Sequence, residues 1–251
     1  MGSTPVYRRI LLKLSGEILK GDGAAGVDPA AVLTAARQVA DLAAAGVQVA
    51  LVIGGGNFFR GLPASRRGGI SRVTADQMGM LATVMNSLAM RDGLDACGVG
   101  VRLQSAIPMA GVAEPFDRQR ALRCLEKGMI VLFAGGTGHA FFTTDTTAAL
   151  RACEIEAEAI LKATKVDGVY TADPKRDPGA RRYRQLSYSD ALDQRLEVMD
   201  ATAFSLCREN RIPIVVFNYF GSGNLCRVVA GDTAAATVVG DLPTLLAACR
   251  T

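Results

Sequence analysis

Three runs of apolar residues in this chain end in small residues and glycine, a pattern that restricts both the fold and the ligand. The runs are ILLKLSG at residues 10–16, VALVIGGGN at 49–57 and MIVLFAGGTG at 129–138. Glycine lets the backbone turn sharply and approach a ligand, and free N–H groups at a helix start attract anions. The runs therefore predict phosphate-binding turns. None has the GK[ST] ending of a P-loop or a GxGxxG fingerprint, so the predicted site is of another kind.

The composition predicts a globular protein with an aliphatic core. Of the 251 residues, 49% are hydrophobic but only 6% are aromatic. A chain of this length can bury roughly 70% of its unfolded surface. The net charge of +4 fits a small anionic ligand, whereas the scattered basic residues argue against a nucleic-acid partner.

Cysteine spacing and the N-terminal sequence indicate the compartment. The six cysteines stand far apart without a CxxC pair, which favours reduced, buried thiols over a zinc site. They are Cys97, Cys124, Cys153, Cys207, Cys226 and Cys249. The N-terminus lacks an apolar signal core, and no apolar run reaches about 18 residues. We expect a cytoplasmic protein with no membrane partner.

Strand-like and helical segments alternate along the chain. Predicted strands cover residues 9–14, 47–53, 99–104, 129–134, 160–162, 214–218 and 236–239, and predicted helices cover 29–44, 75–94, 117–127, 146–157, 187–192 and 201–209. This order predicts an α/β fold, a three-layer αβα sandwich with a mainly parallel central sheet. We expect one domain, residues 1–251, whose two lobes share the sheet, with ligands at the carboxyl ends of the strands.

Two lysines lie near the ends of predicted strands. Lys13 occurs in LLKLSG and Lys162 in AILKATKVDG. Such a lysine either extends along the sheet to solvent or presents a cation to a phosphate beside a glycine turn. Both interpretations stay open for each residue, although the repetition favours the second.

Other polar residues also allow two interpretations. Thr143, Thr144 or Asp145 could cap the helix that follows, as Asp76 and Asp200 could cap theirs. The 143–145 segment follows AGGTG, so hydroxyls and a carboxylate converge on one predicted strand end.

The remaining basic residues are less informative. The triplet at residues 54–56 could share an anion with Arg60, or it could be a plain loop. His139 has no obvious orienting partner, and Arg181, Arg182 and Arg184 fit a solvated loop better than a binding patch.

Taken together, these segments resemble the amino acid kinase superfamily and, within it, the bacterial UMP kinases, over residues 7–239. The residues that carry the resemblance are KLSGE at 13–17, VIGGGNFFRG at 52–61, DQMGMLATVMNSLAMRD at 76–92, FFTTD at 141–145 and LKATKVDGVYTADPKRDP at 161–178. The last is shared with aspartokinases, whereas the 52–61 and 76–92 segments select the UMP branch.

The resemblance implies transfer of the γ-phosphoryl group of ATP to UMP, giving UDP and ADP, with Mg2+ as cofactor. Acceptor binding falls to residues 1–158 and ATP binding to 159–251. The implied catalytic residues are Lys13, Lys162, Asp145, Asp200 and Arg60. The lysines clamp the transferring phosphoryl group, and the carboxylates hold the lysines and help place ATP-bound Mg2+ through water, without a direct protein ligand.

The resemblance also assigns both nucleotide sites. The implied ATP-binding residues are Lys13, Leu14, Ser15, Gly16, Gly56, Arg60, Thr164, Tyr170 and Asp173. The implied UMP-binding residues are Gly55, Arg60, Asp76, Thr137, Gly138, His139, Ala140, Phe141, Phe142, Thr143 and Thr144. Asp76 would grip the ribose hydroxyls. Relatives often read GTGNPFF where this chain has GTGHAFF, which leaves base selectivity open.

Regulation and assembly are implied in the same way. The residues that match a regulatory surface, where GTP activates and UTP inhibits, are Gly21, Asp22, Gly23, Ala24, Ala25, Gly26, Arg91 and Arg102. Asp95 and Met129 depart from the basic residues of some relatives. The resemblance implies a homohexamer with the helix at 75–94 as a contact element. Two alternatives are a kinase for a carboxylate or carbamate acceptor and a storage protein for oxyanions and nucleotides.

Overall fold

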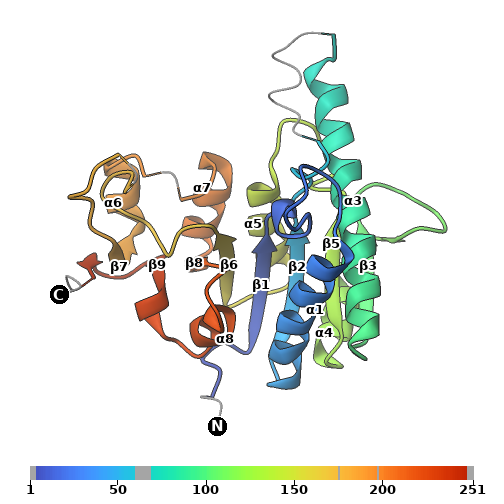
Figure 1. Cartoon of the computed structure of the whole chain (residues 1–251), viewed down its shortest axis with the longest axis horizontal. Helices are drawn as coiled ribbons and strands as arrows, with labels where there is room; N and C mark the ends of the chain where they lie inside the picture. Colours follow the sequence, from blue (N-terminus) through green and yellow to red (C-terminus); the bar gives the residue numbers. More distant parts are fainter. Residues whose placement is uncertain (1–3, 60–68, 175, 197, 248–251) are drawn as a thin grey trace.

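The computed structural model describes residues 4–59, 69–174, 176–196 and 198–247. One ten-stranded sheet runs through this part of the chain in the order β10-β7-β9-β8-β6-β1-β2-β5-β3-β4, with helices on both faces (Figure 1). The strands are β1 (Arg9–Leu14), β2 (Gln48–Ile53), β3 (Val101–Ser105), β4 (Glu114–Pro115), β5 (Ile130–Ala134), β6 (Ala159–Thr164), β7 (Tyr183–Ser187), β8 (Ile214–Asn218), β9 (Ala236–Gly240) and β10 (Leu245–Leu246).

The helices are α1 (Pro29–Ala44), α3 (Arg72–Ala96), α4 (Arg118–Glu126), α5 (Thr144–Glu154), α6 (Tyr188–Asp193), α7 (Ala201–Glu209) and α8 (Asn224–Val229). Short 3-10 helices, η1 (Gly16–Ile18) and η2 (Thr233–Ala235), lie in two connections. The strand pairs are parallel except for β8–β9 and β10–β7. The predicted three-layer α/β fold with a mainly parallel sheet is therefore confirmed.

Two apolar layers cover the sheet. One joins α1, α3 and α8 to Ile10, Leu12 and Leu14 of β1, and the other joins α4, α5, α6 and α7 to Leu11. Successive side chains on a strand point to opposite faces. Lys13 therefore shares the face of Leu11, beneath α5 and α7. By the same alternation in β6, Lys162 shares the face of Ile160.

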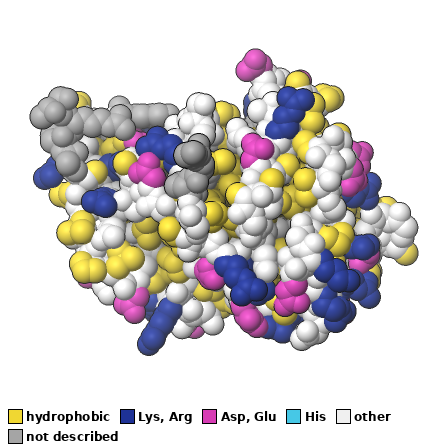
Figure 2. Space-filling model, turned by 90° about the horizontal axis from the view of Figure 1, so that it is seen from below, with side chains coloured by type: hydrophobic (Ala, Val, Ile, Leu, Met, Phe, Trp, Pro, Cys, Tyr) yellow, Lys and Arg dark blue, Asp and Glu magenta, His cyan; other side chains and the backbone are white. Residues whose placement is uncertain are grey.

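The register of the sheet brings both lysines to one place. Lys13 pairs with Lys162 across the parallel β1–β6 ladder, and Val52 of β2 lies on its other side. These strands run in the same direction, so their carboxyl ends lie together on one side of the molecule. The opposite side, where the strands begin, is seen from below in Figure 2 and shows Lys and Arg side chains interspersed with Asp and Glu.

Several predicted boundaries moved because of capping. The helix predicted at 75–94 begins at Arg72, since Ser71 is its N-cap and accepts a hydrogen bond from Thr74 N. Asp76 therefore lies inside the helix and is not a cap. Thr143 caps α5, whereas Asp200 caps α7 by accepting from Ala203 N at 2.9 Å.

Other predictions were wrong. The segment around Arg182 is no solvated loop: Arg184 lies in β7, and the Arg182 guanidinium donates to the carbonyl oxygens of Ala234 and Ala236. The short helix α8 had no counterpart in the prediction. Its Cys226 is exposed, whereas we expected a buried thiol. Cys124 and Cys207 are buried and Cys97 and Cys153 partly so, while Cys249 lies outside the described residues.

Candidate functional site

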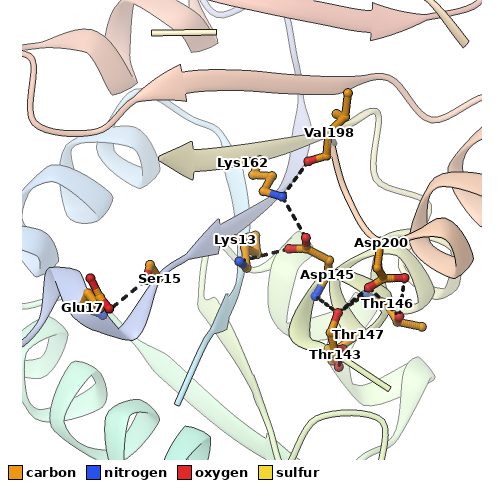
Figure 3. Close-up of polar contacts among 10 residues, drawn as sticks. All are labelled: Lys13, Ser15, Glu17, Thr143, Asp145, Thr146, Thr147, Lys162, Val198 and Asp200. Carbon is orange, nitrogen blue, oxygen red and sulfur yellow. Dashed lines mark hydrogen bonds and ion pairs between the residues drawn. The ribbon is translucent and has the colours of Figure 1, made fainter. Parts of the chain in front are cut away.

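Two lysines and one aspartate form the centre of the site at the carboxyl ends of β1 and β6 (Figure 3). Asp145 lies in the first turn of α5 and forms two ion pairs. Its Oδ1 lies 3.0 Å from Lys13 Nζ, and its Oδ2 lies 2.8 Å from Lys162 Nζ. Lys162 also donates to the Val198 carbonyl oxygen at 2.6 Å. The structure therefore brings together three residues that the sequence predicted separately.

The charges of this cluster do not cancel. Two ammonium groups share one carboxylate, and the side chains are only 14% (Lys13), 16% (Lys162) and 16% (Asp145) exposed. Burial pushes the pKa of Asp145 upward, but the two lysines outweigh it and hold the pKa below its ordinary value. Burial, together with the neighbouring charge of Lys13, lowers the pKa of Lys162, although Asp145 raises it. The two ammonium groups suit an anionic ligand such as a phosphate, although the Asp200 carboxylate also acts on Lys162 and reduces the local positive charge.

Asp200 links α7 to the start of α5. Its carboxylate accepts hydrogen bonds from the hydroxyls of Thr143 and Thr146, the latter at 3.0 Å on Oδ1 and 2.9 Å on Oδ2. Thr143 Oγ1 in turn accepts from Asp145 N at 3.0 Å. Asp200 thus fixes the helix turn that presents Asp145, without touching either lysine. Thr146 was missed because its role depends on where α7 packs.

The Asp76 carboxylate faces the loop after β5. Its Oδ2 accepts from Phe141 N at 2.7 Å and from Arg72 Nε at 2.7 Å. Phe141 has φ +71°, a strained value for a residue with a side chain, and it is 64% exposed. The residues described here donate nothing to Oδ1, which leaves that oxygen for ligand hydroxyls. The i,i+4 spacing of Arg72 and Asp76 could have revealed their pairing, but the predicted helix began too late.

The rest of the predicted acceptor segment forms the turn between β5 and α5. Thr137 Oγ1 accepts a hydrogen bond from His139 N at 3.3 Å, and Gly138 N donates to the Gly135 carbonyl at 3.1 Å. Phe142 is 46% exposed. Ala140 follows His139 in this turn, and Thr144 begins α5.

A cavity of about 370 Å3 opens beside Lys162. Its lining includes three further predicted ATP-binding residues, Thr164, Tyr170 and Asp173. Arg195, Leu196 and Val198 also line it, together with Val166, Gly168, Val169, Ala172, Pro174 and Val216. Arg195, Leu196 and Val198 were missed because only tertiary packing brings them to β6. Most lining residues are apolar, and the charged ones are Lys162, Asp173 and Arg195, a combination that suits a nucleotide whose phosphates point at Lys162.

The glycine turns after β1 and β2 lie against each other. A side chain at Gly16 would place its Cβ 2.2 Å from the Gly54 carbonyl oxygen, and one at Gly55 would come 2.7 Å from the Gly79 carbonyl oxygen. Gly54 N donates to the Leu14 carbonyl at 2.9 Å. Leu14 is fully buried, backbone included, although the sequence predicted it among the ATP-binding residues. Ser15 caps η1, and Gly56 is partly buried.

The predicted regulatory residues do not line the cavity beside Lys162. Arg60 lies outside the described residues. Arg91 and Arg102 line a cavity of about 430 Å3 with Glu114, and Arg102 Nη1 contacts Glu114 Oε1 at 2.8 Å. The loop at 21–26 does not line that cavity; instead, Gly26 N donates to the Asn57 carbonyl at 3.0 Å.

Comparison with known proteins identifies the class. A sequence model of the amino acid kinase family matches residues 8–218. The chain belongs to the amino acid kinase family. Among solved structures it is similar to the UMP kinase of Bacillus anthracis, at 40% identity and a TM-score of 0.92, covering 96% of this chain and 99% of that one.

Two further solved structures are similar over most of the chain. The UMP kinase of Ureaplasma parvum is 36% identical with a TM-score of 0.88, covering 93% of this chain and 99% of that one. The uridylate kinase of Archaeoglobus fulgidus is 27% identical with a TM-score of 0.70, covering 92% and 99%.

Proposed function

We propose that this protein is an ATP-dependent UMP kinase. A phosphate oxygen of UMP attacks the γ-phosphorus of ATP, the bond from that phosphorus to the β,γ-bridging oxygen breaks, and UDP and ADP leave. The observation that carries the proposal is the Lys13–Asp145–Lys162 cluster at the strand ends of a fold shared with UMP kinases. The acceptor oxygen is already ionised, so the reaction needs no dedicated general base.

The two lysines supply the main catalytic effect. Phosphoryl transfer spreads negative charge over the transferring group, and fixed cations stabilise that charge most when water is excluded. Lys13 and Lys162 are largely buried and held by Asp145, so they need little reorganisation during the reaction. Asp200 is a positioning residue that holds the start of α5 through Thr143 and Thr146.

We assign the acceptor to the residues 1–158 and the donor to 159–251. Asp76 Oδ1 would accept from the ribose hydroxyls, and the turn at 137–144 would surround the UMP phosphate. The ATP base and ribose would occupy the cavity lined by Thr164, Tyr170 and Asp173, with the phosphates directed at Lys162. Arg60 would complete the anion site beside Gly55 and Gly56.

Mg2+ belongs to the proposal as a companion of ATP. It prefers hard oxygen ligands and keeps several waters, so it binds mainly through substrate phosphates. Asp145 and Asp200 supply carboxylate oxygens near the strand ends, a donor set that fits water-mediated contact. When bound, the ion would neutralise charge on the phosphates that the lysines do not reach.

The deciding experiment measures ADP release with ATP, Mg2+ and a panel of acceptors. UMP should give the fastest turnover among UMP, CMP, dTMP, acetylglutamate and carbamate. Turnover with a carboxylate or carbamate instead would support that alternative. Nucleotide binding without turnover of any acceptor would favour the storage function.

Assembly, regulation and location form a second proposal. We infer a homohexamer in which α3 contributes a contact, because Met78, Leu81 and Met85 are 39%, 44% and 50% exposed on one helical face. GTP activation and UTP inhibition would act through Arg91, Arg102 and the loop at 21–26.

We expect a cytoplasmic enzyme. Separately, none of the described helices has the length and apolar character needed to span a bilayer.

A further inference from the structure

Helix α3 holds two of the glycine turns through one row of buried polar side chains. Thr83 Oγ1 accepts a hydrogen bond from Gly135 N at 2.9 Å, and Asn86 Nδ2 donates to the Gly54 carbonyl at 2.7 Å. Residues three apart lie on the same helical face. The turns after β5 and β2 therefore rest on neighbouring positions of one helix.

Asn86 also forms a reciprocal amide pair with Asn57. Asn57 Nδ2 donates to Asn86 Oδ1 at 2.9 Å, and Asn86 Nδ2 donates to Asn57 Oδ1 at 2.7 Å. The second N–H of Asn57 reaches the Gly26 carbonyl at 2.7 Å. Both residues are buried, at 4% and 0% exposure, and every amide N–H of the pair has an acceptor. A buried network that is fully satisfied in this way specifies one geometry.

This network fixes the direction of the Gly55 N–H. The described residues contain no cis peptide bond, and in a trans peptide the C=O and the next N–H point in opposite directions. With its carbonyl held by Asn86, the Gly54–Gly55 peptide turns the Gly55 N–H away from that side chain. Gly55 is buried, yet no residue within the described ranges accepts from its N–H. A buried N–H without an acceptor is rare, and a ligand oxygen would complete it.

We propose that Asn86 and Asn57 are positioning residues for the phosphoryl-transfer site. They hold the Gly54 carbonyl so that the Gly55 N–H faces a phosphate oxygen, and they tie this turn to Gly26. The inference rests on the proposed kinase function and adds to it two residues that position the site without contacting substrate. It also gives α3 a part in orienting the acceptor side of the site.

The variant N86A tests this positioning role, with S87A as its matched control. Ser87 is also buried in α3, at 1% exposure, but its hydroxyl donates to Thr83 O within the same helix. N86A should lower kcat about 100-fold, as expected when a contact atom moves by about 1 Å. It should also weaken calorimetric binding of UMP about tenfold. S87A should change each value less than about threefold.

A second variant, N86D, separates positioning from general destabilisation. Burial raises the pKa of an introduced carboxyl group, and only its protonated form can donate to the Gly54 carbonyl. The ratio of kcat for N86D to kcat for wild type should therefore rise as pH falls from 9 to 6, whereas the ratio for N86A should stay flat. All assays are run well below the melting temperature of each variant.

The outcomes distinguish the inference from the function on which it rests. Equal losses in N86A and S87A, or kcat in N86A within about threefold of wild type, would overturn the positioning role. A flat N86D ratio would do the same. If wild type binds UMP and AMP-PNP but transfers no phosphoryl group, the proposed function fails, and the UMP titrations still decide the role of Asn86. Binding of neither nucleotide would overturn both.

Discussion

Replacing Lys162 with methionine should separate catalysis from stability in this protein. Methionine keeps most of the side-chain volume and removes the charge. Lys162 Nζ contacts Asp145 Oδ2 at 2.8 Å and the Val198 carbonyl at 2.6 Å. In K162M, Asp145 keeps its ion pair with Lys13 at 3.0 Å, so no buried charge is left without a partner.

The expected magnitudes follow from these contacts. Removing one preorganised group that stabilises transition-state charge costs about 10²- to 10³-fold in kcat. Loss of the hydrogen bond to Val198 O costs about 1 kcal/mol of stability. Against this, the lowered pKa of Lys162 means that folding disfavours its charged form, so removing the charge returns free energy. The net stability change should stay within about 1 kcal/mol, or about 2–4 °C in melting temperature.

The stability difference between wild type and K162M should depend on pH. Because the folded pKa of Lys162 lies below its unfolded value, the unfolded chain binds the proton more tightly between the two pKa values. Wild type should therefore gain stability relative to K162M as pH rises through that window toward about 10.4.

Steady-state kinetics and thermal unfolding of the same preparations test the reasoning. The KM for ATP should change less than about threefold if Lys162 acts mainly in the transition state. Lys165 is the matched control, since it is 69% exposed and pairs only with Glu17 among the contacts described. K165M should behave as wild type in both assays. A kcat for K162M within tenfold of wild type, or a melting temperature lowered by more than about 10 °C, would refute the argument.

Three further substitutions probe the other parts of the site. D145N leaves two buried ammonium groups facing a neutral amide and should cost about 3 kcal/mol; because the pKa of Asp145 is lowered, thermal unfolding should show this deficit persisting down to about pH 3.9 and closing as wild type is protonated below that. D76N should raise the KM for UMP at least about tenfold more than the KM for ATP, and equal increases would contradict the ribose assignment. M85E should shift the protein to smaller species in analytical ultracentrifugation, and an unchanged mass would remove α3 from the interface.

Strong local signals made much of the fold predictable. The predicted bounds of β1, α1, α7 and β8 match the structure, because each has an uninterrupted apolar pattern and most have a clear cap or turn at their ends. The strand β7 reads YRQLS and lacks such a pattern. It pairs with β9 and β10, and Arg182, just before it, donates to carbonyl groups of η2 and β9. A contact of this kind across the sheet leaves no local trace in the sequence.

In the candidate site, too, some residues had a local sequence signal and others depend on tertiary contacts. Lys13 and Lys162 stood out because lysine is unusual in an apolar strand, and the structure places both against Asp145. Arg195 and Val198 carried no such signal, since their place beside Lys162 depends on the packing of the chain after α6. Asn86 resembled any polar residue in a long helix. Its partners, Asn57 and the Gly54 carbonyl, become neighbours only when α3 packs against β2.

The pairing of Lys13 with Lys162 across the β1–β6 ladder fixes the distance between the backbones of these two residues. Adjacent strands lie about 4.8 Å apart, a spacing fixed by the backbone hydrogen bonds between them. The origins of the two cations therefore cannot separate or close together unless the middle of the sheet breaks. The sheet therefore fixes where the two lysine side chains begin, and only their side-chain torsions can adjust to the ligand.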